Sequence, residues 1–158
     1  MQDKSNVKIA ILDTGVKLSH PALSNATIHG YAISYDGKNV IISDNFDDNL
    51  GHGTAIASII HSIAPQCEIT AIRMFADNLN LEEETLIKVL GYIAENEKFD
   101  IINISSGITQ PSHLDDLCKI CKIISDKGTL ILSAFDNEGA VAYPAAFDNV
   151  IGVDSGDF

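Results

Sequence analysis

Two short motifs contain residue types that can share a proton during catalysis. Asp-Thr-Gly at 13–15 follows the apolar run 7–12, and Gly-His-Gly-Thr at 51–54 opens a run of small residues. A carboxylate that orients a histidine prepares that ring to deprotonate a nucleophile. The residue types and their spacing therefore indicate nucleophilic catalysis, with Asp13 and His52 as the candidate catalytic pair.

The neighbours of these two residues indicate that both are held in fixed positions. In an open parallel sheet the active site lies beyond the carboxyl ends of the strands, and Asp13 comes directly after a strand-like run. Gly51 and Gly53 let the backbone around His52 approach other segments closely, and a helix-like run follows at 54–60. The other histidines lack such neighbours and are interpreted as ordinary surface or core residues: His20, His29, His61 and His113.

Short apolar runs predict the strands of a buried parallel sheet. They cover 7–12, 69–75, 101–104, 129–134 and 150–153. A helix is predicted between the second and third runs, because apolar residues recur there at helical spacing behind the acidic residues 82–84. Its apolar positions are Leu86, Val89, Leu90 and Ile93.

A second helix is predicted from Ser112 to Lys127. Ser112 is its expected N-cap, with Asp115 three residues later, and Gly128 is its expected stop. Its predicted apolar stripe consists of Leu114, Leu117, Cys118, Cys121 and Ile124. Residues 25–49 instead mix polar and β-branched side chains around a turn signal at 35–38, which predicts a hairpin or an irregular excursion.

Strands that alternate with helices predict an α/β fold, in which a mostly parallel central sheet carries helices on both faces. The chain has 158 residues, of which 46% are hydrophobic. That length suffices for one domain with a real core, covering 1–158, and leaves little room for a second.

Charge and cysteine content limit the partners and the compartment. The chain carries 10 Lys and Arg against 22 Asp and Glu, a net charge of −12, which repels nucleic acid and anionic membrane surfaces. The N-terminal residues show no signal for export or membrane insertion. Three cysteines, an odd number, argue against a closed disulfide framework. We therefore predict a cytoplasmic protein that binds neither nucleic acid nor membranes.

Two groups of residues have side chains that could act as metal ligands. Cys118 and Cys121 have the C-x-x-C spacing, but they lack a second pair and lie on an apolar stripe, which favours core packing. The loop before His52 is rich in oxygen ligands without a regular loop spacing: Asp44, Asn45, Asp47, Asp48 and Asn49. No metal ligand or cofactor is assigned, and calcium is left as an alternative to a solvated acidic loop.

Three further segments follow the two motifs in order. They read Asp-Ile-Ile-Asn-Ile-Ser-Ser-Gly at 100–107, Leu-Ser-Ala-Phe-Asp-Asn-Glu-Gly at 132–139, and Tyr-Pro-Ala-Ala-Phe at 143–147 leading to Val-Ile-Gly-Val at 150–153. With these segments the chain resembles the subtilisin-like serine proteases, or subtilases, in which Asp, His and Ser follow one another along the chain. The resemblance covers nearly the whole chain and implies a subtilisin-like three-layer fold that hydrolyses peptide bonds.

The same resemblance implies further site residues. Ser105, Ser106 and Gly107 match the substrate-binding strand, where an extended peptide pairs its backbone with the enzyme and Ser-x-Gly shapes the specificity pocket. Asn137 matches the residue whose side-chain amide stabilises the oxyanion. The implied partner is a peptide or protein substrate.

Two features depart from the subtilase pattern. Asp136, preceded by Phe135, stands where the family usually has glycine before the oxyanion asparagine, and a carboxylate there could oppose the developing negative charge. The Gly-Thr-Ser motif that carries the nucleophile would lie beyond Phe158. We therefore expect a catalytic domain that is truncated before its serine-bearing helix and is inactive alone. A C-terminal segment would complete it. Without that segment, apolar strand surface should be exposed.

Four serines of the chain are alternative nucleophiles, and two further functions are alternatives to proteolysis. Ser105, Ser106, Ser133 and Ser155 qualify by residue type only. The first two match the substrate-binding strand and Ser133 lies inside a predicted core strand, while Ser155 lacks the glycine-bounded turn and following helix that would fix its hydroxyl. A pseudoprotease that binds an extended peptide at 101–107 without cleaving it is the second hypothesis. The third is an unrelated α/β ligand-binding domain, but no Gly-rich phosphate loop follows 7–12.

Overall fold

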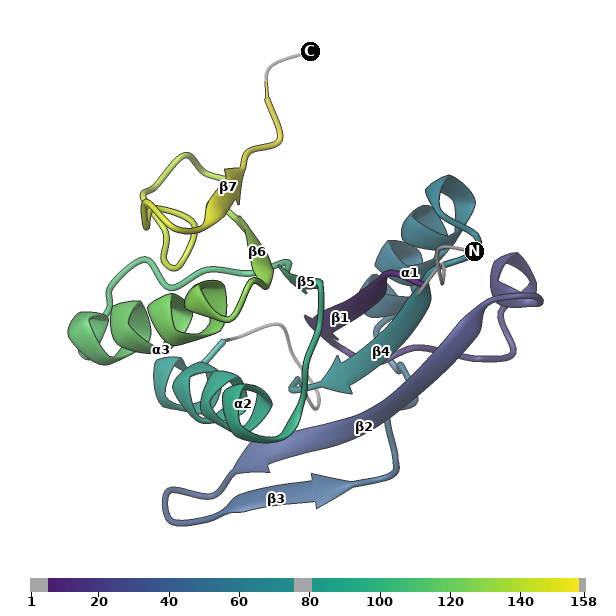
Figure 1. The fold of residues 1–158 in the computed structure, drawn as a ribbon, viewed down its shortest axis with the longest axis horizontal. Helices are drawn as coiled ribbons and strands as arrows, with labels where there is room; N and C mark the ends of the chain where they lie inside the picture. The colour runs from purple at the N-terminus through teal and green to yellow at the C-terminus, as the bar shows by residue number, and fades with distance from the viewer. Residues whose placement is uncertain (1–5, 76–80, 157–158) are drawn as a thin grey trace.

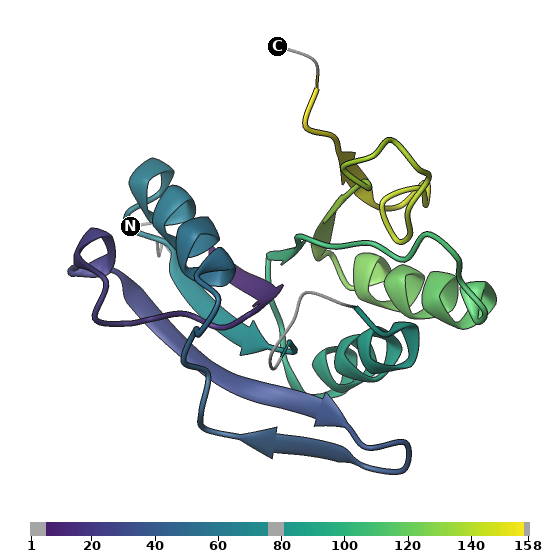
Figure 2. The same cartoon turned by 180° about the vertical axis from the view of Figure 1, so that it is seen from behind.

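The computed structural model of the chain describes residues 6–75 and 81–156. In this part of the chain seven strands form one sheet, in the order β3-β2-β4-β1-β5-β6-β7. Helices α2 and α3 cover one face and α1 covers the other, which gives three layers (Figure 1, Figure 2). The predicted α/β fold with helices on both faces of a mostly parallel sheet is confirmed. The strands are β1 (Lys8–Asp13), β2 (Thr27–Tyr35), β3 (Val40–Ser43), β4 (Glu68–Arg73), β5 (Ile101–Ile104), β6 (Leu130–Ala134) and β7 (Ile151–Val153).

Each of the five predicted apolar runs overlaps a strand, and these five strands pair in parallel. β1 lies between β4 and β5 and is buried on both sides. Ala10 and Leu12 pack with α2 and α3, whereas Ile9 and Ile11 pack with α1. Burial on both faces explains why β1 reads as a continuous apolar run rather than as an alternating one.

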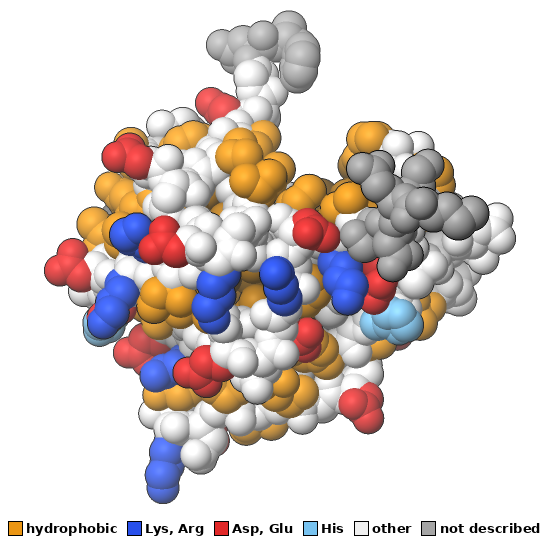
Figure 3. Space-filling model, in the orientation of Figure 1, with side chains coloured by type: hydrophobic (Ala, Val, Ile, Leu, Met, Phe, Trp, Pro, Cys, Tyr) orange, Lys and Arg blue, Asp and Glu red, His pale blue; other side chains and the backbone are white. Residues whose placement is uncertain are grey.

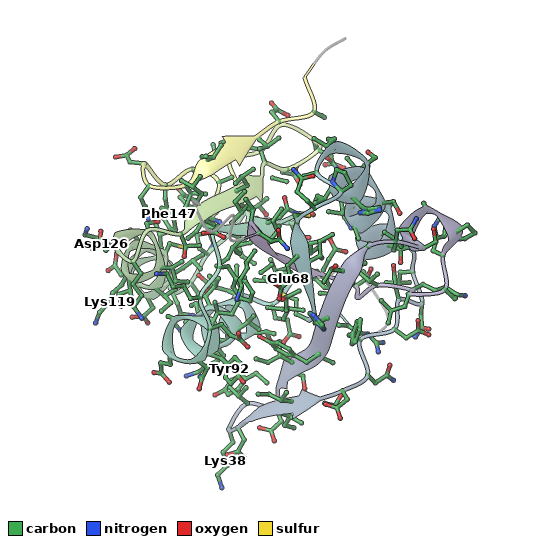
Figure 4. All side chains as sticks on the ribbon, turned by 45° about the vertical axis from the view of Figure 1, so that its right-hand side comes forward. Lys38, Glu68, Tyr92, Lys119, Asp126 and Phe147 are labelled. Atoms are coloured by element: carbon green, nitrogen blue, oxygen red, sulfur yellow. The ribbon has the colours of Figure 1, made fainter. Side chains whose placement is uncertain are left out.

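The hairpin predicted within 25–49 is confirmed. β2 and β3 are antiparallel, and the N–H groups of Lys38 and Asn39 donate to Asp36 Oδ1 at 2.8 and 2.7 Å in the turn. Lys38 lies at the tip of this hairpin (Figure 4). β2 also pairs in parallel with β4, which the sequence did not predict, so the hairpin extends the sheet instead of leaving it.

The helices are α1 (His52–Ile63), α2 (Glu83–Asn96) and α3 (Leu114–Asp126), with a short 3-10 helix η1 (Pro21–Leu23). In α2 the predicted apolar positions are all buried: Leu86, Val89, Leu90 and Ile93. Each such side chain contributes roughly 1.5–3 kcal/mol when it is fully buried. Tyr92 of the same helix packs edge-on against Tyr31 of β2, with ring centroids 6.0 Å apart, and joins α2 to that strand.

The predicted start of α3 is wrong. The helix begins at Leu114 with His113 as its N-cap residue, not at Ser112. The reason is a contact with α2: Glu83 accepts hydrogen bonds from the N–H of Ser112 at 2.7 Å and of His113 at 3.0 Å. With these groups bound to α2, His113 keeps a backbone conformation outside the helical region (φ −125°, ψ 44°), and the helix starts at the next residue.

The apolar stripe of α3 is also narrower than predicted. Leu117, Cys121 and Ile124 are buried, but Cys118 is exposed. One residue turns the helix by about 100°, so Cys118 points away from the face that Leu117 buries. Burial raises the pKa of the Cys121 thiol to about 12, with a smaller contribution from Cys118. Core packing, predicted for both cysteines, is confirmed for Cys121 only.

In the described part of the chain, no helix covers β6 and β7 on the face of the sheet that carries α1. The strand register places Leu130, Leu132, Ile151 and Val153 on the same side as Ile9, which faces α1. We call these four residues the open face. Leu130 is 55% exposed, Ile151 48% and Val153 47%. Figure 3 shows hydrophobic side chains around the hollow between the C-terminal strands and the lobe that contains α1.

Candidate active site

Asp13 and His52 are in direct contact. His52 Nδ1–H donates to Asp13 Oδ1 at 2.8 Å and to Oδ2 at 2.9 Å. The Asp13 side chain is 2% exposed and that of His52 is 41% exposed. With the proton on Nδ1, the neutral ring keeps a free lone pair on Nε2, which is the arrangement that a general base needs.

The sequence brings these two residues together through backbone that approaches closely. Asp13 ends the central strand β1, and its carbonyl accepts a hydrogen bond from Met74 N–H at 3.0 Å. His52 begins α1 after Gly51, whose φ of 87° favours glycine. A Cβ on Gly53 would collide with the carbonyl oxygen of Gly15. The glycine beside His52 is therefore required for α1 to reach the end of β1.

Asp48 is the second buried carboxylate in this region besides Asp13, and the sequence placed it only in the acidic loop. It is 6% exposed and accepts five hydrogen bonds. Burial alone would raise its pKa, but hydrogen bonds from Thr54, Gly51 and Thr14 outweigh that effect and lower the pKa to about 2. An acidic residue shortly before a helix start was the available signal, because such residues commonly bind free N–H groups there.

In the described part of the chain, no three His, Cys, Asp or Glu side chains converge as a metal site would require. Both oxygens of Asp48 are occupied by protein donors. Calcium binding by the acidic loop therefore stays an untested alternative to a solvated loop.

The Ser105–Gly107 segment follows β5 and lies beside the end of β6. Ser105 Oγ accepts from Asn103 Nδ2 at 2.9 Å, and Ser133 Oγ donates to the Ser106 carbonyl at 3.4 Å. A Cβ on Gly107 would come within 2.6 Å of Ala142 Cβ, so glycine fits this place where a side chain would not. The backbone of Ile108 then pairs with Tyr143 through hydrogen bonds of 2.8 and 2.9 Å. The segment is thus held from two sides.

Asn137 lies in the exposed turn after β6. Its neighbour Asp136 accepts a hydrogen bond from Glu138 N–H through Oδ2 at 2.9 Å, so one oxygen of this unusual carboxylate is bound within the turn. The ring of Phe135 lies against Gly152 of β7, where a Cβ would come 2.5 Å from a ring carbon. Asp136 and the bulky Phe135 before it therefore both have local partners in this structure.

The predicted site residues gather at one edge of the sheet. β1, β5 and β6 are parallel neighbours, so Asp13, the 105–107 segment and Asn137 all follow the carboxyl ends of adjacent strands. Of these residues, Asp13 and His52 make the direct contact. Among the alternative serines, Ser105 and Ser133 hydrogen-bond to Asn103 and Ser106, and Ser155 lies beyond β7.

Comparison with known proteins gives consistent matches. The profile of the Subtilase family matches residues 4–157. The Major intracellular serine protease of Bacillus subtilis (strain 168) is 34% identical over 169 aligned residues, which cover 95% of this chain and 51% of that protein. The Minor extracellular protease Epr of the same organism is 32% identical and covers 94% of this chain and 23% of that protein. The chain therefore spans about half or less of these relatives' lengths.

A solved structure, the S41 psychrophilic protease, is 26% identical with a TM-score of 0.72, over 94% of this chain and 52% of that chain. Among residues 6–75 and 81–156, no helix has the length and apolar character needed to cross a bilayer. With a family match over nearly all of its residues, an Asp-His contact at the end of the central strand and the same fold as a solved protease, the chain belongs to the subtilase family.

Proposed function

We propose that this chain supplies Asp13 and His52 of an Asp-His-Ser triad that hydrolyses peptide bonds, and that a segment outside the chain supplies the serine. The chain alone is then inactive. The observation that carries the proposal is the paired hydrogen bond of 2.8 and 2.9 Å between a buried carboxylate and a half-exposed imidazole.

The chemistry follows from the orientation of the ring. His52 Nε2 takes the proton of the serine hydroxyl as its oxygen attacks the peptide carbonyl, and Asp13 stabilises the imidazolium that forms. His52 then returns the proton to the leaving amine, and water repeats the sequence to release the acyl group. Because Asp13 is buried, its carboxylate stays aligned with Nδ1 through both steps.

Two further segments have roles in the proposal. Asn137 donates its side-chain amide to the carbonyl oxygen as negative charge develops. The 105–107 segment pairs with the backbone of an extended peptide or protein substrate. The placement of both segments beside Asp13 at the carboxyl edge of the sheet supports these assignments.

The open face supports the proposal that a further segment packs on this chain. Leu130 and Ile151 are about half exposed there, and a helix laid on them would be covered on one side by sheet. That face also carries α1, whose first residue is His52. A serine on a helix packed beside α1 could therefore reach the ring of His52.

A cytoplasmic location is part of the proposal. The cysteines of the chain are free in this structure, and one relative is named an intracellular protease. Neither a nucleic-acid partner nor a membrane partner is proposed, because the net charge of −12 opposes both. Cell fractionation with an antibody to the chain tests the location, and recovery from the culture medium would contradict it.

Hydrolysis of a denatured protein substrate tests the proposed activity. We compare the chain alone with a protein extended by the residues encoded after Phe158. Only the extended protein should cleave, and His52→Ala should abolish its cleavage. Saturable peptide binding by the extended protein without turnover would support the peptide-binding pseudoprotease instead.

A further inference from the structure

The hydroxyl of Thr14 connects the two segments that carry the Asp13–His52 pair. It accepts a hydrogen bond from Gly53 N–H at 2.9 Å and donates to Asp48 Oδ1 at 2.8 Å. Thr14 adjoins Asp13, and Gly53 adjoins His52. Because the hydroxyl proton is committed to Asp48, the lone pairs of the oxygen are directed to Gly53.

The hydroxyl of Thr54 makes a second connection of the same kind. It donates to Asp48 Oδ2 at 2.5 Å and accepts from Lys17 N–H at 3.0 Å. Lys17 lies in the segment that leaves β1, and Thr54 lies in the first turn of α1. Asp48 therefore orients two hydroxyls, each of which joins the β1 side to the α1 side.

The same carboxylate accepts hydrogen bonds from backbone N–H groups just before α1 and in its first turn. The N-cap residue Gly51 has no side chain to do so. Asp48 accepts instead from the N–H of Leu50 at 3.0 Å, of Gly51 at 2.7 Å and of Thr54 at 2.9 Å. An ionised carboxylate suits this place because it offers only acceptors, whereas an amide would present N–H groups to some of the donors.

We propose that Asp48 is a positioning residue for the Asp13–His52 pair, which it keeps in register through the hydroxyls of Thr14 and Thr54. This inference rests on the proposed function for its importance in catalysis, but the hydrogen bond that it concerns is measurable without any turnover. Asp48 does not contact the reacting atoms.

NMR of the His52 Nδ1–H proton tests the proposal directly. A proton held between an imidazole and a buried carboxylate is far downfield and exchanges slowly with water. Asp48→Asn should speed this exchange by at least about tenfold, because the ring loses its fixed partner geometry. Asp47→Asn, which removes a neighbouring exposed carboxylate, should leave the exchange unchanged. The proposal would be overturned if the His52 Nδ1–H proton exchanged at the same rate in Asp48→Asn and in the unaltered chain, while the amide NMR spectra showed that both are folded.

A pair of variants at Thr14 keeps the test decisive if Asp48→Asn does not fold. Thr14→Ser retains the hydroxyl and should preserve slow exchange of the His52 proton, whereas Thr14→Val removes it and should speed exchange. Identical exchange in the two variants would contradict the proposal. In the extended protein, Thr14→Val should lower kcat and leave KM unchanged, and failure of that protein to turn over would count against the proposed function alone.

Discussion

At the scale of single residues, the site combines a carboxylate that is almost fully buried with an imidazole that is open on one side. Asp13 is 2% exposed and His52 is 41% exposed. Burial fixes the carboxylate, and its other hydrogen bond, from Thr14 N–H at 2.7 Å, limits its rotation. In the proposed function, the nucleophile and the substrate approach the open side of the ring.

Replacing Asp13 tests this division of roles. Asp13→Asn in the extended protein should lower kcat by about 10⁴-fold, because an amide no longer fixes the tautomer that leaves Nε2 basic. Rates with a chromogenic peptide measure the effect. Asp116→Asn, on the exposed surface of α3, is the control and should match the unaltered enzyme. A loss below tenfold for Asp13→Asn would show that the pair is not catalytic.

Asp48 predicts how stability depends on pH. Its folded pKa of about 2 lies below the ordinary value of 3.8. Ionised Asp48 therefore stabilises the fold above the ordinary pKa, by about 2 kcal/mol at pH 7, and this stabilisation is lost as pH falls through the folded pKa. Urea unfolding of the chain and of Asp48→Asn should differ at pH 7, and the difference should shrink between about pH 4 and pH 2. A difference independent of pH would refute this.

The sequence was sufficient to predict the Asp13–His52 pair but not the role of Asp48. The two motifs are recognisable from local sequence, because Asp13 directly follows a strand-like run and His52 lies between two glycines. Three hydrogen-bond partners of Asp48 lie within six residues of it, but its bond to Thr14 depends on how residues 44–51 return toward a residue 34 positions earlier. Local pattern carries no information about such a long-range contact, so Asp48 looked like one more acid in a polar loop.

At the scale of elements, local periodicity predicted the strands and helices, and tertiary contacts set their ends. α2 follows its apolar spacing closely, with Leu86, Val89, Leu90 and Ile93 all buried. α3 starts later than its sequence suggests because Glu83 of α2 binds the N–H groups of Ser112 and His113. The sequence of neither helix alone indicates this contact between α2 and the start of α3.

Two glycines make a matched test of packing within elements. At Gly152 in β7 a Cβ would meet the Phe135 ring at 2.5 Å and the Ala145 carbonyl oxygen at 2.6 Å, so Gly152→Ala should destabilise the chain by roughly 1–3 kcal/mol. At Gly91 within α2 a Cβ would meet nothing within 4 Å. Gly91→Ala should therefore stabilise by about 0.5–1 kcal/mol. Urea unfolding measures both, and effects of the same sign would contradict this packing.

At the scale of the whole molecule, the two faces of the sheet are covered unequally. α2 and α3 cover one face of the sheet. On the other face α1 covers only part of the sheet, and the open face lies beside it. The expectation that apolar strand surface would be bare agrees with the exposure of Leu130, Ile151 and Val153.

The open face should contribute to stability once a segment covers it. In the extended protein, Ile151→Thr should lower the free energy of unfolding by about 1–2 kcal/mol, since it replaces an apolar contact. Ile123→Thr, on the exposed side of α3, should change it by less than about 0.5 kcal/mol. Chemical denaturation compares the two. Equal effects would show that nothing packs on the open face.

Labelling with a fluorophosphonate probe is the most direct test of the central claim, that this chain holds the Asp and His of a serine protease and takes its serine from elsewhere. Mass spectrometry locates the modified residue. The protein extended past Phe158 should be labelled on a serine outside residues 1–158, and His52→Ala should remove the label, while the chain alone should stay unmodified. Labelling of Ser105, Ser106, Ser133 or Ser155 in the chain alone would contradict the account.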